Sequence, residues 1–203
     1  MNINKDKISN FYKKNFNAYG DSFESVGWGD VSSQYLRFQK LTDGLIKEGS
    51  SILDYGCGLG HFVDYLENQH LKKYQYVGID LCDSFIKHAM QKYHSKKNIN
   101  FYTGDISQKN LRNHSFDIAI ASGVFSLKQE NIETYTFQTL SKMFELVDES
   151  VSVNFLTKHC DYELEKNIHH DPSAILKEAF KITSNLRLLH DYELYEFTLI
   201  LNK

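Results

Sequence analysis

The chain contains little proline, arginine or cysteine. Its 203 residues include one proline, three arginines and three cysteines, and the formal net charge is −3. Nucleic-acid-binding proteins usually carry clustered arginine and lysine, so scattered arginines and a weak negative charge argue against a nucleic-acid partner. Three unevenly spaced cysteines are too few for a disulfide framework or a zinc site. We therefore expect no bound metal, and a reducing location, the cytoplasm.

Long apolar runs are absent as well. No segment approaches the roughly eighteen uninterrupted apolar residues that a membrane-spanning helix needs. The first residues, Met-Asn-Ile-Asn-Lys-Asp-Lys, contain no apolar leader segment. The sequence therefore predicts a protein that is neither exported nor embedded in a membrane.

The apolar content that is present suits one core. Hydrophobic residues make up 41% of the chain, which at this length predicts a single domain, residues 1–203. Neither an internal repeat nor a linker-like stretch marks a boundary within it. We divide the domain into an N-terminal extension, residues 1–48, and a core, residues 49–203.

Short runs rich in β-branched and aromatic residues predict strands, and helical patterns lie before and between them. This alternation predicts a parallel sheet with helices on both faces. Only about three residues join the last two strands, too few for a parallel crossover, so these two should form an antiparallel hairpin. The expected strands are 51–55, 74–79, 98–103, 116–122, 149–156, 182–190 and 194–201, and the expected helices are 5–18, 32–47, 59–69, 82–94, 130–146 and 172–180.

The most informative segment is residues 52–60, Ile-Leu-Asp-Tyr-Gly-Cys-Gly-Leu-Gly. Alternate glycines after a short apolar run indicate a backbone that a ligand can approach closely. Dinucleotide sites usually have another glycine three places after the second, but here His61 stands there. The Asp54 carboxylate would repel a pyrophosphate and attract an ammonium or a sulfonium, and S-adenosylmethionine carries both of these groups.

This segment resembles motif I of the class I S-adenosylmethionine-dependent methyltransferases, Asp-x-Gly-x-Gly-x-Gly. Asp54, Gly56, Gly58 and Gly60 match it without a departure. The resemblance covers residues 50–203 in motif order. It implies an α/β, Rossmann-like, doubly wound sheet of five parallel strands plus a C-terminal antiparallel hairpin. It also implies S-adenosylmethionine as cofactor and S-adenosylhomocysteine as its product.

Two further acids follow predicted strands. Asp80 ends the second strand beside the glycine loop, where a carboxylate can accept hydrogen bonds from both ribose hydroxyls. Such an acid also serves NAD, and a helix N-cap is the purely structural alternative. Asp105, after the third strand, resembles the acid that accepts a hydrogen bond from the adenine amino group, with the Ile106 amide facing the ring. A turn aspartate is the alternative there.

The fourth predicted strand ends at Ser122-Gly123 and resembles motif IV, where the methyl group is delivered. It lacks the Asn/Asp-Pro-Pro-Tyr/Phe motif of base-amine and glutamine methyltransferases and the Pro-Cys of cytosine C5 enzymes. Arg37, on the helix before motif I, is expected to bind the cofactor's carboxylate or an anionic acceptor, rather than to be an exposed helix arginine. The full set of expected cofactor contacts is Arg37, Asp54, Gly56, Cys57, Gly58, Gly60, Asp80, Leu81, Gly104, Asp105, Ile106, Ser122 and Gly123.

Candidate acceptor contacts follow the fifth predicted strand. Asn154 lies at its end, and His169 and His170 come soon after, with Tyr19 as a further candidate from the extension. A histidine there would act as a base toward a hydroxyl or an amine, or as a cationic donor toward a phosphate or carboxylate. A polar surface loop is the alternative. A metal site is not expected, because adjacent histidines rarely point the same way and no third ligand is suitably spaced.

The extension is rich in aromatic residues, and we expect it to form a helical lid, with residues 1–30 closing over the bound cofactor. Ordinary packing of extra helices is the alternative. The predicted function is O- or N-methylation of a small polar metabolite: a sugar, a natural-product intermediate, or an acceptor bearing a phosphate or carboxylate. A non-catalytic methyltransferase-like subunit and a NAD-dependent oxidoreductase stay open as alternatives. The chain is expected to be a monomer or a homodimer.

Overall fold

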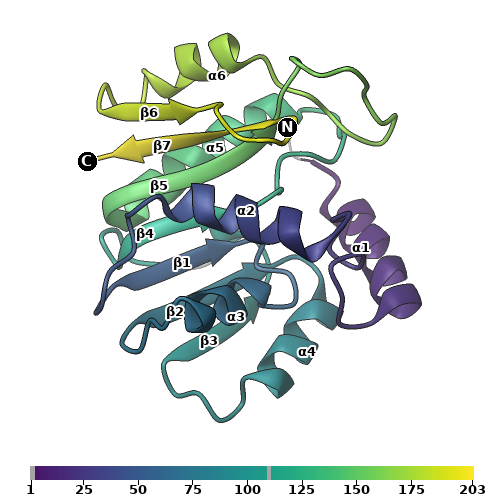
Figure 1. The fold of residues 1–203 in the computed structure, drawn as a ribbon, viewed down its shortest axis with the longest axis vertical. Coiled ribbons are helices and arrows are strands. Elements are labelled where there is room, and N and C mark those ends of the chain that lie inside the picture. Colours follow the sequence, from purple (N-terminus) through teal and green to yellow (C-terminus); the bar gives the residue numbers. More distant parts are fainter. Residues whose placement is uncertain (1–2, 109–110) are drawn as a thin grey trace.

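A computed structural model describes residues 3–108 and 111–203, and the strands described there form one sheet (Figure 1). They are β1 (Ser51–Tyr55), β2 (Gln75–Asp80), β3 (Ile99–Thr103), β4 (Phe116–Ala121), β5 (Val147–Leu156), β6 (Leu186–Leu189) and β7 (Glu196–Asn202). Their order across the sheet is β3-β2-β1-β4-β5-β7-β6. The first five strands along the chain run parallel, whereas β7 is antiparallel to β5 and β6. The expected fold class, with its C-terminal antiparallel hairpin, is confirmed.

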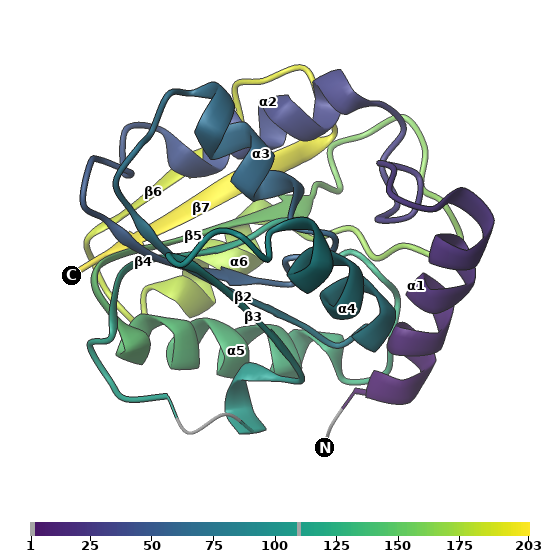
Figure 2. The ribbon, with the colours of Figure 1, turned by 90° about the horizontal axis from the view of Figure 1, so that it is seen from below.

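Helices cover both faces of this sheet (Figure 2). Residues of α2, α3 and α4 pack in one hydrophobic cluster, and residues of α5 and α6 pack in the other. None of the helices in the described ranges is long and apolar enough to cross a membrane. The helices are α1 (Lys5–Tyr19), α2 (Val31–Thr42), α3 (His61–Asn68), α4 (Asp83–Lys92), α5 (Ile132–Leu146), α6 (Pro172–Ala179) and the short 3₁₀ helix η1 (Ile106–Gln108).

The alternation of side chains along β1 explains why both faces need cover. Ile52 belongs to the cluster under α2 and α3, whereas Leu53 and Tyr55 belong to the cluster under α5. Parallel strands buried on both faces are rich in apolar residues throughout, and β4 is so from Ile118 to Ala121. Asp54 is the one charged residue of β1, and it is buried.

Two elements are shorter than the sequence suggested. We expected a helix at 32–47, but α2 ends at Thr42, because Asp43 and Gly44 have φ angles of 24° and 78° in the left-handed region. We expected a strand at 182–190, but β6 spans only Leu186–Leu189. The Ile182 amide donates to the Ala179 carbonyl over 2.9 Å, so the chain is still turning out of α6 there.

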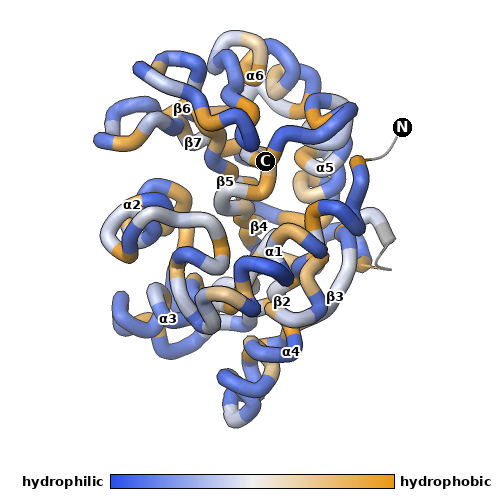
Figure 3. The backbone as a smooth tube through the Cα atoms, turned by 90° about the vertical axis from the view of Figure 1, so that its right-hand side faces the viewer, coloured by the Kyte–Doolittle hydropathy of each residue, from blue (hydrophilic) through white to orange (hydrophobic). Residues whose placement is uncertain are grey.

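The helix α1 stands at the end of the sheet where the parallel strands finish (Figures 2 and 3). Ser9 Oγ donates to the Leu81 carbonyl over 3.1 Å, just after β2. The Phe16 ring packs edge-on against Phe85 of α4, with centroids 5.7 Å apart. α1 thus packs beside the ends of the parallel strands, and the closure of residues 1–30 over a bound cofactor stays a prediction.

Candidate active site

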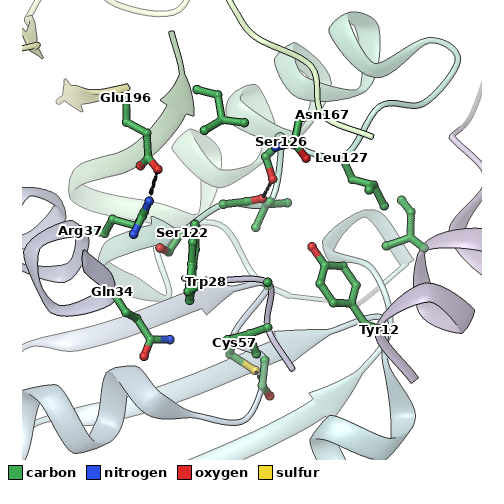
Figure 4. A pocket seen from close by; sticks show the side chains of 18 of the residues that line it. Tyr12, Trp28, Gln34, Arg37, Cys57, Ser122, Ser126, Leu127, Asn167 and Glu196 are labelled. Atoms are coloured by element: carbon green, nitrogen blue, oxygen red, sulfur yellow. Dashed lines mark hydrogen bonds and ion pairs between the residues drawn. The ribbon is translucent and has the colours of Figure 1, made fainter. Parts of the chain in front are cut away.

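A cavity of about 990 Å³ opens beyond the carboxyl ends of β1, β2 and β4. Its walls come from α1 and the chain after it, the glycine loop after β1, the turn after β4, the segment after β5 and the start of β7 (Figure 4). Ligands of open α/β sheets bind at this edge, where the strand order reverses between β1 and β4. The fold thus brings the residues that end three separate strands to one cavity.

The glycine loop is held by backbone hydrogen bonds. The Gly56 and Cys57 amides both donate to the Ile79 carbonyl, over 2.7 and 3.2 Å. At Gly58 the φ angle is 56°, and a Cβ atom would stand 2.9 Å from Cγ1 of Val26. The sequence predicted that a ligand approaches this loop closely, which stays a prediction; at Gly58 the structure shows a side chain of the N-terminal extension, Val26, packed against the loop.

Asp80 lines the cavity and fixes the same loop. Its Oδ2 accepts from the Gly58 amide over 2.9 Å, and its Oδ1 accepts from the Cys82 amide over 2.7 Å. Burial raises the pKa of this carboxyl, and the backbone hydrogen bonds oppose that shift. A carboxylate can accept about four hydrogen bonds, so Asp80 keeps acceptor capacity for a ligand hydroxyl beside these backbone donors.

Asp54 lines the cavity from the end of β1. The Tyr76 hydroxyl donates to its Oδ2 over 2.7 Å. Burial raises the pKa of the Asp54 carboxyl to about 7, the Tyr76 hydrogen bond opposes this, and the neighbouring Asp80 charge adds to it. Among the described residues no cationic side chain pairs with this buried carboxyl, and a ligand ammonium would supply such a partner.

Arg37 is buried, not exposed on the surface of its helix. Its Nε and Nη2 donate to Oε1 of Glu196 over 2.8 and 2.5 Å. Its guanidinium lies over the Trp28 ring, 4.0 Å from the ring centroid. Sequence reasoning missed both partners. The available signal for Glu196 was its place at the start of the apolar run of the last strand. An acid that faces inward from such a strand needs a cationic or donor partner.

Asp105 has partners other than those we expected. It is fully buried and does not line the cavity, and neither Gly104 nor Ile106 does. Its carboxylate accepts from Tyr55 and Tyr135 and lies 3.2 Å from the Lys5 ammonium. Ser107 donates to Oδ1 through both its amide and its hydroxyl. These five donors leave no position on Asp105 for an adenine amino group. The predicted cofactor contacts of Gly104, Asp105 and Ile106 are therefore wrong in this structure, since none of the three lines the cavity.

His169 and His170 differ in their position relative to the cavity. His170 does not line the cavity: its Nε2 lies 3.0 Å from the Phe125 carbonyl, and its ring packs on Phe155 with centroids 5.1 Å apart. Burial lowers the pKa of His170, which keeps it neutral. His169 does line the cavity, with Nδ1 2.7 Å from the Thr157 carbonyl. The acceptor role predicted for His170 is therefore withdrawn, and that for His169 is kept.

The other two catalytic candidates lie away from the cavity wall. Tyr19, at the end of α1, is 58% exposed and does not line the cavity. Asn154 is buried between two partners: its Oδ1 accepts from the Gly123 amide and its Nδ2 donates to Glu196 Oε2, each over 2.7 Å. Asn154 thus affects the cavity only by holding Gly123 and Glu196, which line it. Tyr19 does not line the cavity.

One cluster in the described ranges has the residue types of a metal site. Ligand atoms of Cys160, Glu163 and His169 lie within 4.8 Å of one another. The His169 nitrogen beside Cys160 Sγ is Nδ1, at 3.4 Å, and it also faces the Thr157 carbonyl over 2.7 Å, so this nitrogen carries its hydrogen and only Nε2 keeps a lone pair. Glu163 is exposed. We therefore assign no metal to the cluster.

Comparisons with known proteins agree with this geometry. The sequence profile of a family described as "Methyltransferase domain" matches residues 52–148. A protein from Mycobacterium tuberculosis that carries the name of a methyltransferase is 28% identical over 160 residues, which cover 75% of this chain and 93% of that protein. The phosphoethanolamine N-methyltransferase of Plasmodium falciparum is 30% identical over 138 residues, covering 64% of this chain and 50% of that enzyme.

A solved structure shares the fold over nearly the whole chain. Phosphoethanolamine N-methyltransferase 1 of Haemonchus contortus, in complex with phosphoethanolamine and S-adenosylhomocysteine, superposes with a TM-score of 0.72 and 11% identity. The match covers 98% of this chain and 48% of that enzyme. The matches therefore span about half the length of the phosphoethanolamine enzymes from Plasmodium falciparum and Haemonchus contortus.

Proposed function

Because the chain is a class I S-adenosylmethionine-dependent methyltransferase, we propose that it methylates a small polar acceptor inside the cavity described above. One observation carries this proposal: a single cavity runs from the glycine loop at Gly58 to His169 in the segment after β5. Its volume of about 990 Å³ lies at the upper end of the range for small-molecule sites, which leaves room for a cofactor and a second small molecule.

The residues at the strand ends fit the cofactor. Asp80 keeps acceptor capacity for ribose hydroxyls, and Asp54 is a buried carboxyl that a ligand ammonium would pair with. Tyr12 and Phe85 line the cavity near Asp80 and offer apolar surface. The bound cofactor supplies a methyl group activated on a sulfonium sulfur. What the protein has to add is alignment of the acceptor and exclusion of water.

In this proposal, the N-terminal extension excludes water from the cavity. Val26 reaches the glycine loop and Trp28 reaches Gly123, so this segment covers the cavity from the side of the strand ends. A cavity covered in this way suits an acceptor that can enter whole, which favours a small metabolite over a protein or RNA. The extension, residues 1–48, and the core, residues 49–203, thus act as one methyltransferase domain in this proposal.

The acceptor side of the cavity carries polar groups suited to an anionic acceptor. Lys166, Asn167 and His169 line it from the segment after β5. A cation and hydrogen-bond donors are the groups that bind a phosphate or carboxylate. Two relatives, from Zea mays and Plasmodium falciparum, are named as phosphoethanolamine N-methyltransferases. We therefore propose an acceptor that bears a phosphate or a carboxylate, with phosphoethanolamine as the first compound to test.

Calorimetry tests the cofactor part of the proposal. S-adenosylhomocysteine should bind, and NAD should not. Replacing Asp80 with Ala removes two charge-assisted hydrogen bonds to the ribose, so the affinity should fall at least about tenfold. Asp83→Asn is the matched control, because Asp83 forms its ion pair with the exposed Lys87 and does not line the cavity. Tight NAD binding without S-adenosylhomocysteine binding would refute the proposal.

A methylation assay tests the acceptor part. Phosphoethanolamine and ethanolamine differ only in the phosphate, so the proposal expects turnover of the first and little of the second. Lys166→Ala should raise the KM for phosphoethanolamine while the affinity for S-adenosylhomocysteine stays unchanged. Equal turnover of the two amines would show that the phosphate is not recognised.

A further inference from the structure

Asp21 lies in the loop between α1 and α2 and contacts two helices of the core. Its Oδ1 accepts from Nε2 of His61, the first residue of α3, over 2.9 Å. On α4, Nε2 of His88 and Nζ of Lys92 lie 3.1 and 3.2 Å from its Oδ2. His88 and Lys92 are four positions apart, so they share one face of that helix. One carboxylate of the extension thus meets three side chains that can carry a positive charge.

A second carboxylate faces the same cluster. Oδ2 of Asp64, on α3, lies 2.9 Å from Nζ of Lys92, and its Oδ1 accepts from the Tyr93 hydroxyl over 2.8 Å. Burial raises the pKa of Asp21, but its three partners outweigh burial and lower the pKa to about 2, so Asp21 stays ionised at neutral pH. With both histidines neutral, two carboxylates face one ammonium. This excess of negative charge favours the binding of a proton by a histidine.

The two histidines of the cluster are held differently. Nδ1 of His61 faces Nε2 of Gln34 on α2 at 3.2 Å, so its other nitrogen carries the hydrogen that Asp21 receives. Nε2 of His88 is buried and makes no hydrogen bond of good geometry within the described residues. The Phe16 ring of α1 packs edge-on against His88, with centroids 5.5 Å apart. The attraction between His88 and Asp21 therefore depends on the charge that a histidine gains as the pH falls from about 8 to about 5.

Asp21 ties the cover of the cavity to the core. We use the term cover for residues 20–30, whose Val26 and Trp28 reach the glycine loop and the turn after β4. Hydrogen bonds inside this loop join its two arms, for example from the Trp28 amide to the Phe23 carbonyl over 3.0 Å. Because the loop is held together in this way, release of Asp21 should loosen its contacts at Val26 and Trp28 together.

We propose that Asp21, His61, His88 and Lys92 form an ionic latch that holds the cover over the cavity, and that the latch loosens as the two histidines lose their protons. The cover then opens more readily at slightly alkaline pH than at slightly acid pH. Opening of such a segment limits the rate of many enzymes, so the latch would set how fast a product leaves. The inference goes beyond the proposed function, because it concerns the free protein.

Quenching of Trp28 fluorescence by acrylamide tests the latch without any ligand. The chain has no other tryptophan, and acrylamide is uncharged, so local charge does not attract or repel it. An exposed ion pair changes an equilibrium by about two- to fivefold. Loss of both histidine charges should therefore raise the ratio of open to covered protein by at least about fourfold. We expect quenching of the wild type to increase between about pH 6 and about pH 8.

Two variants and a control locate the titrating groups. Asp21→Asn removes the charge that the three partners share, so quenching should be strong at both pH values. His88→Gln should match the wild type at the higher pH and be quenched more at the lower one. Asp148→Asn is the matched control: it removes the carboxylate of another histidine–aspartate pair, His114 Nδ1 to Asp148 Oδ1 at 2.6 Å, which is exposed and away from the cavity. It should behave as the wild type, and circular dichroism should show all these proteins folded.

Three results would overturn the inference. Wild-type quenching that does not change with pH would show that the histidines do not control the cover. Equal quenching of Asp21→Asn and the wild type at both pH values would show that Asp21 does not hold it. A pH response that survives in Asp21→Asn would place the titrating group elsewhere, for example at Asp54. Failure of S-adenosylhomocysteine to bind would refute the proposed function and leave the quenching result as it stands.

Discussion

Trp28 lies so close to Gly123 that a Cβ atom on this glycine would stand 2.5 Å from Cη2 of the indole. The contact joins the N-terminal extension to the turn after β4, beside the guanidinium of Arg37. The same glycine has a φ angle of 71°, which disfavours any residue with a Cβ. Glycine is therefore needed there both for the turn and for the docking of the extension.

Gly123→Ala should displace Trp28 and loosen the extension. Trp28 is the single tryptophan of the chain, so tryptophan fluorescence reports on the surroundings of this one ring. We expect an altered emission spectrum, faster hydrogen exchange in residues 20–30, and S-adenosylhomocysteine affinity reduced about tenfold, because the cavity is no longer covered. Gly29→Ala is the control, since nothing lies within 4 Å of its added Cβ. Equal spectra and exchange in the two variants would contradict this view of the contact.

In the wild-type protein, hydrogen exchange in the same segment should slow when S-adenosylhomocysteine is added. The extension already covers the cavity, and a ligand that contacts Val26 and Trp28 would add to its protection. Exchange that is identical with and without ligand would leave packing as the whole role of these residues.

The pKa of Asp54, raised by burial to about 7, predicts how cofactor affinity depends on pH. A ligand ammonium pairs with the ionised carboxyl, so the affinity for S-adenosylhomocysteine should rise by about tenfold between about pH 6 and about pH 8. Tyr76→Phe removes the hydrogen bond that opposes the shift, so its rise should occur at higher pH. Asp54→Asn should bind more weakly, with a flat profile. A flat wild-type profile would show that Asp54 does not meet the ammonium.

The same carboxyl affects the stability of the free protein in the opposite sense. The pKa of this carboxyl is higher in the folded state than in the unfolded state, where it is about 3.9. At pH values between these two pKa values, the folded state therefore binds more protons than the unfolded state. Its contribution to stability therefore declines as the pH rises from about 4 to about 7. Asp54→Asn removes this decline, and thermal unfolding at several pH values would detect the difference.

His169 and His170 should give different phenotypes. His170 is buried and its ring packs on Phe155, so His170→Ala should lower the free energy of unfolding by about 2–4 kcal/mol. Burial lowers its pKa, so in the wild type its stabilising effect is lost as the pH falls below about 6.5. His169→Gln should keep stability and cofactor affinity but reduce turnover of the acceptor. Denaturant unfolding and a methylation assay on both variants would check this, and equal losses of turnover in two stably folded proteins would contradict it.

Asp105 should matter for folding more than for binding. Asp105→Asn weakens the contacts to Tyr55, Tyr135 and Lys5, so the free energy of unfolding should fall by about 2 kcal/mol. Burial alone would raise the pKa of Asp105, but hydrogen bonds from Ser107 and Tyr135 and the Lys5 charge lower it, so this stabilisation is lost in acid. The affinity for 5′-methylthioadenosine should not change. A tenfold loss would show that adenine does reach Asp105.

The sequence by itself determined the sheet and the place of the cavity. Strand periodicity and the short link before the last strand were enough to predict five parallel strands and an antiparallel pair. Asp54 and Asp80 could be placed at strand ends because position along a strand follows from local sequence. In a parallel sheet these ends meet at one edge, so their convergence on one cavity needed no knowledge of side-chain packing.

Only the tertiary structure decided what each of the other polar groups contacts. Arg37 and Glu196 are 159 positions apart in the chain, and no local pattern pairs them. Asp105 ends its strand as expected, yet side chains from β1, α5 and the start of α1 take up its carboxylate. His170 points inward because it pairs with Thr157 beside β5, a contact set by how the returning segment packs. Spacing along the chain fixes which edge a residue reaches, whereas contacts between distant segments depend on packing, which sequence periodicity does not encode.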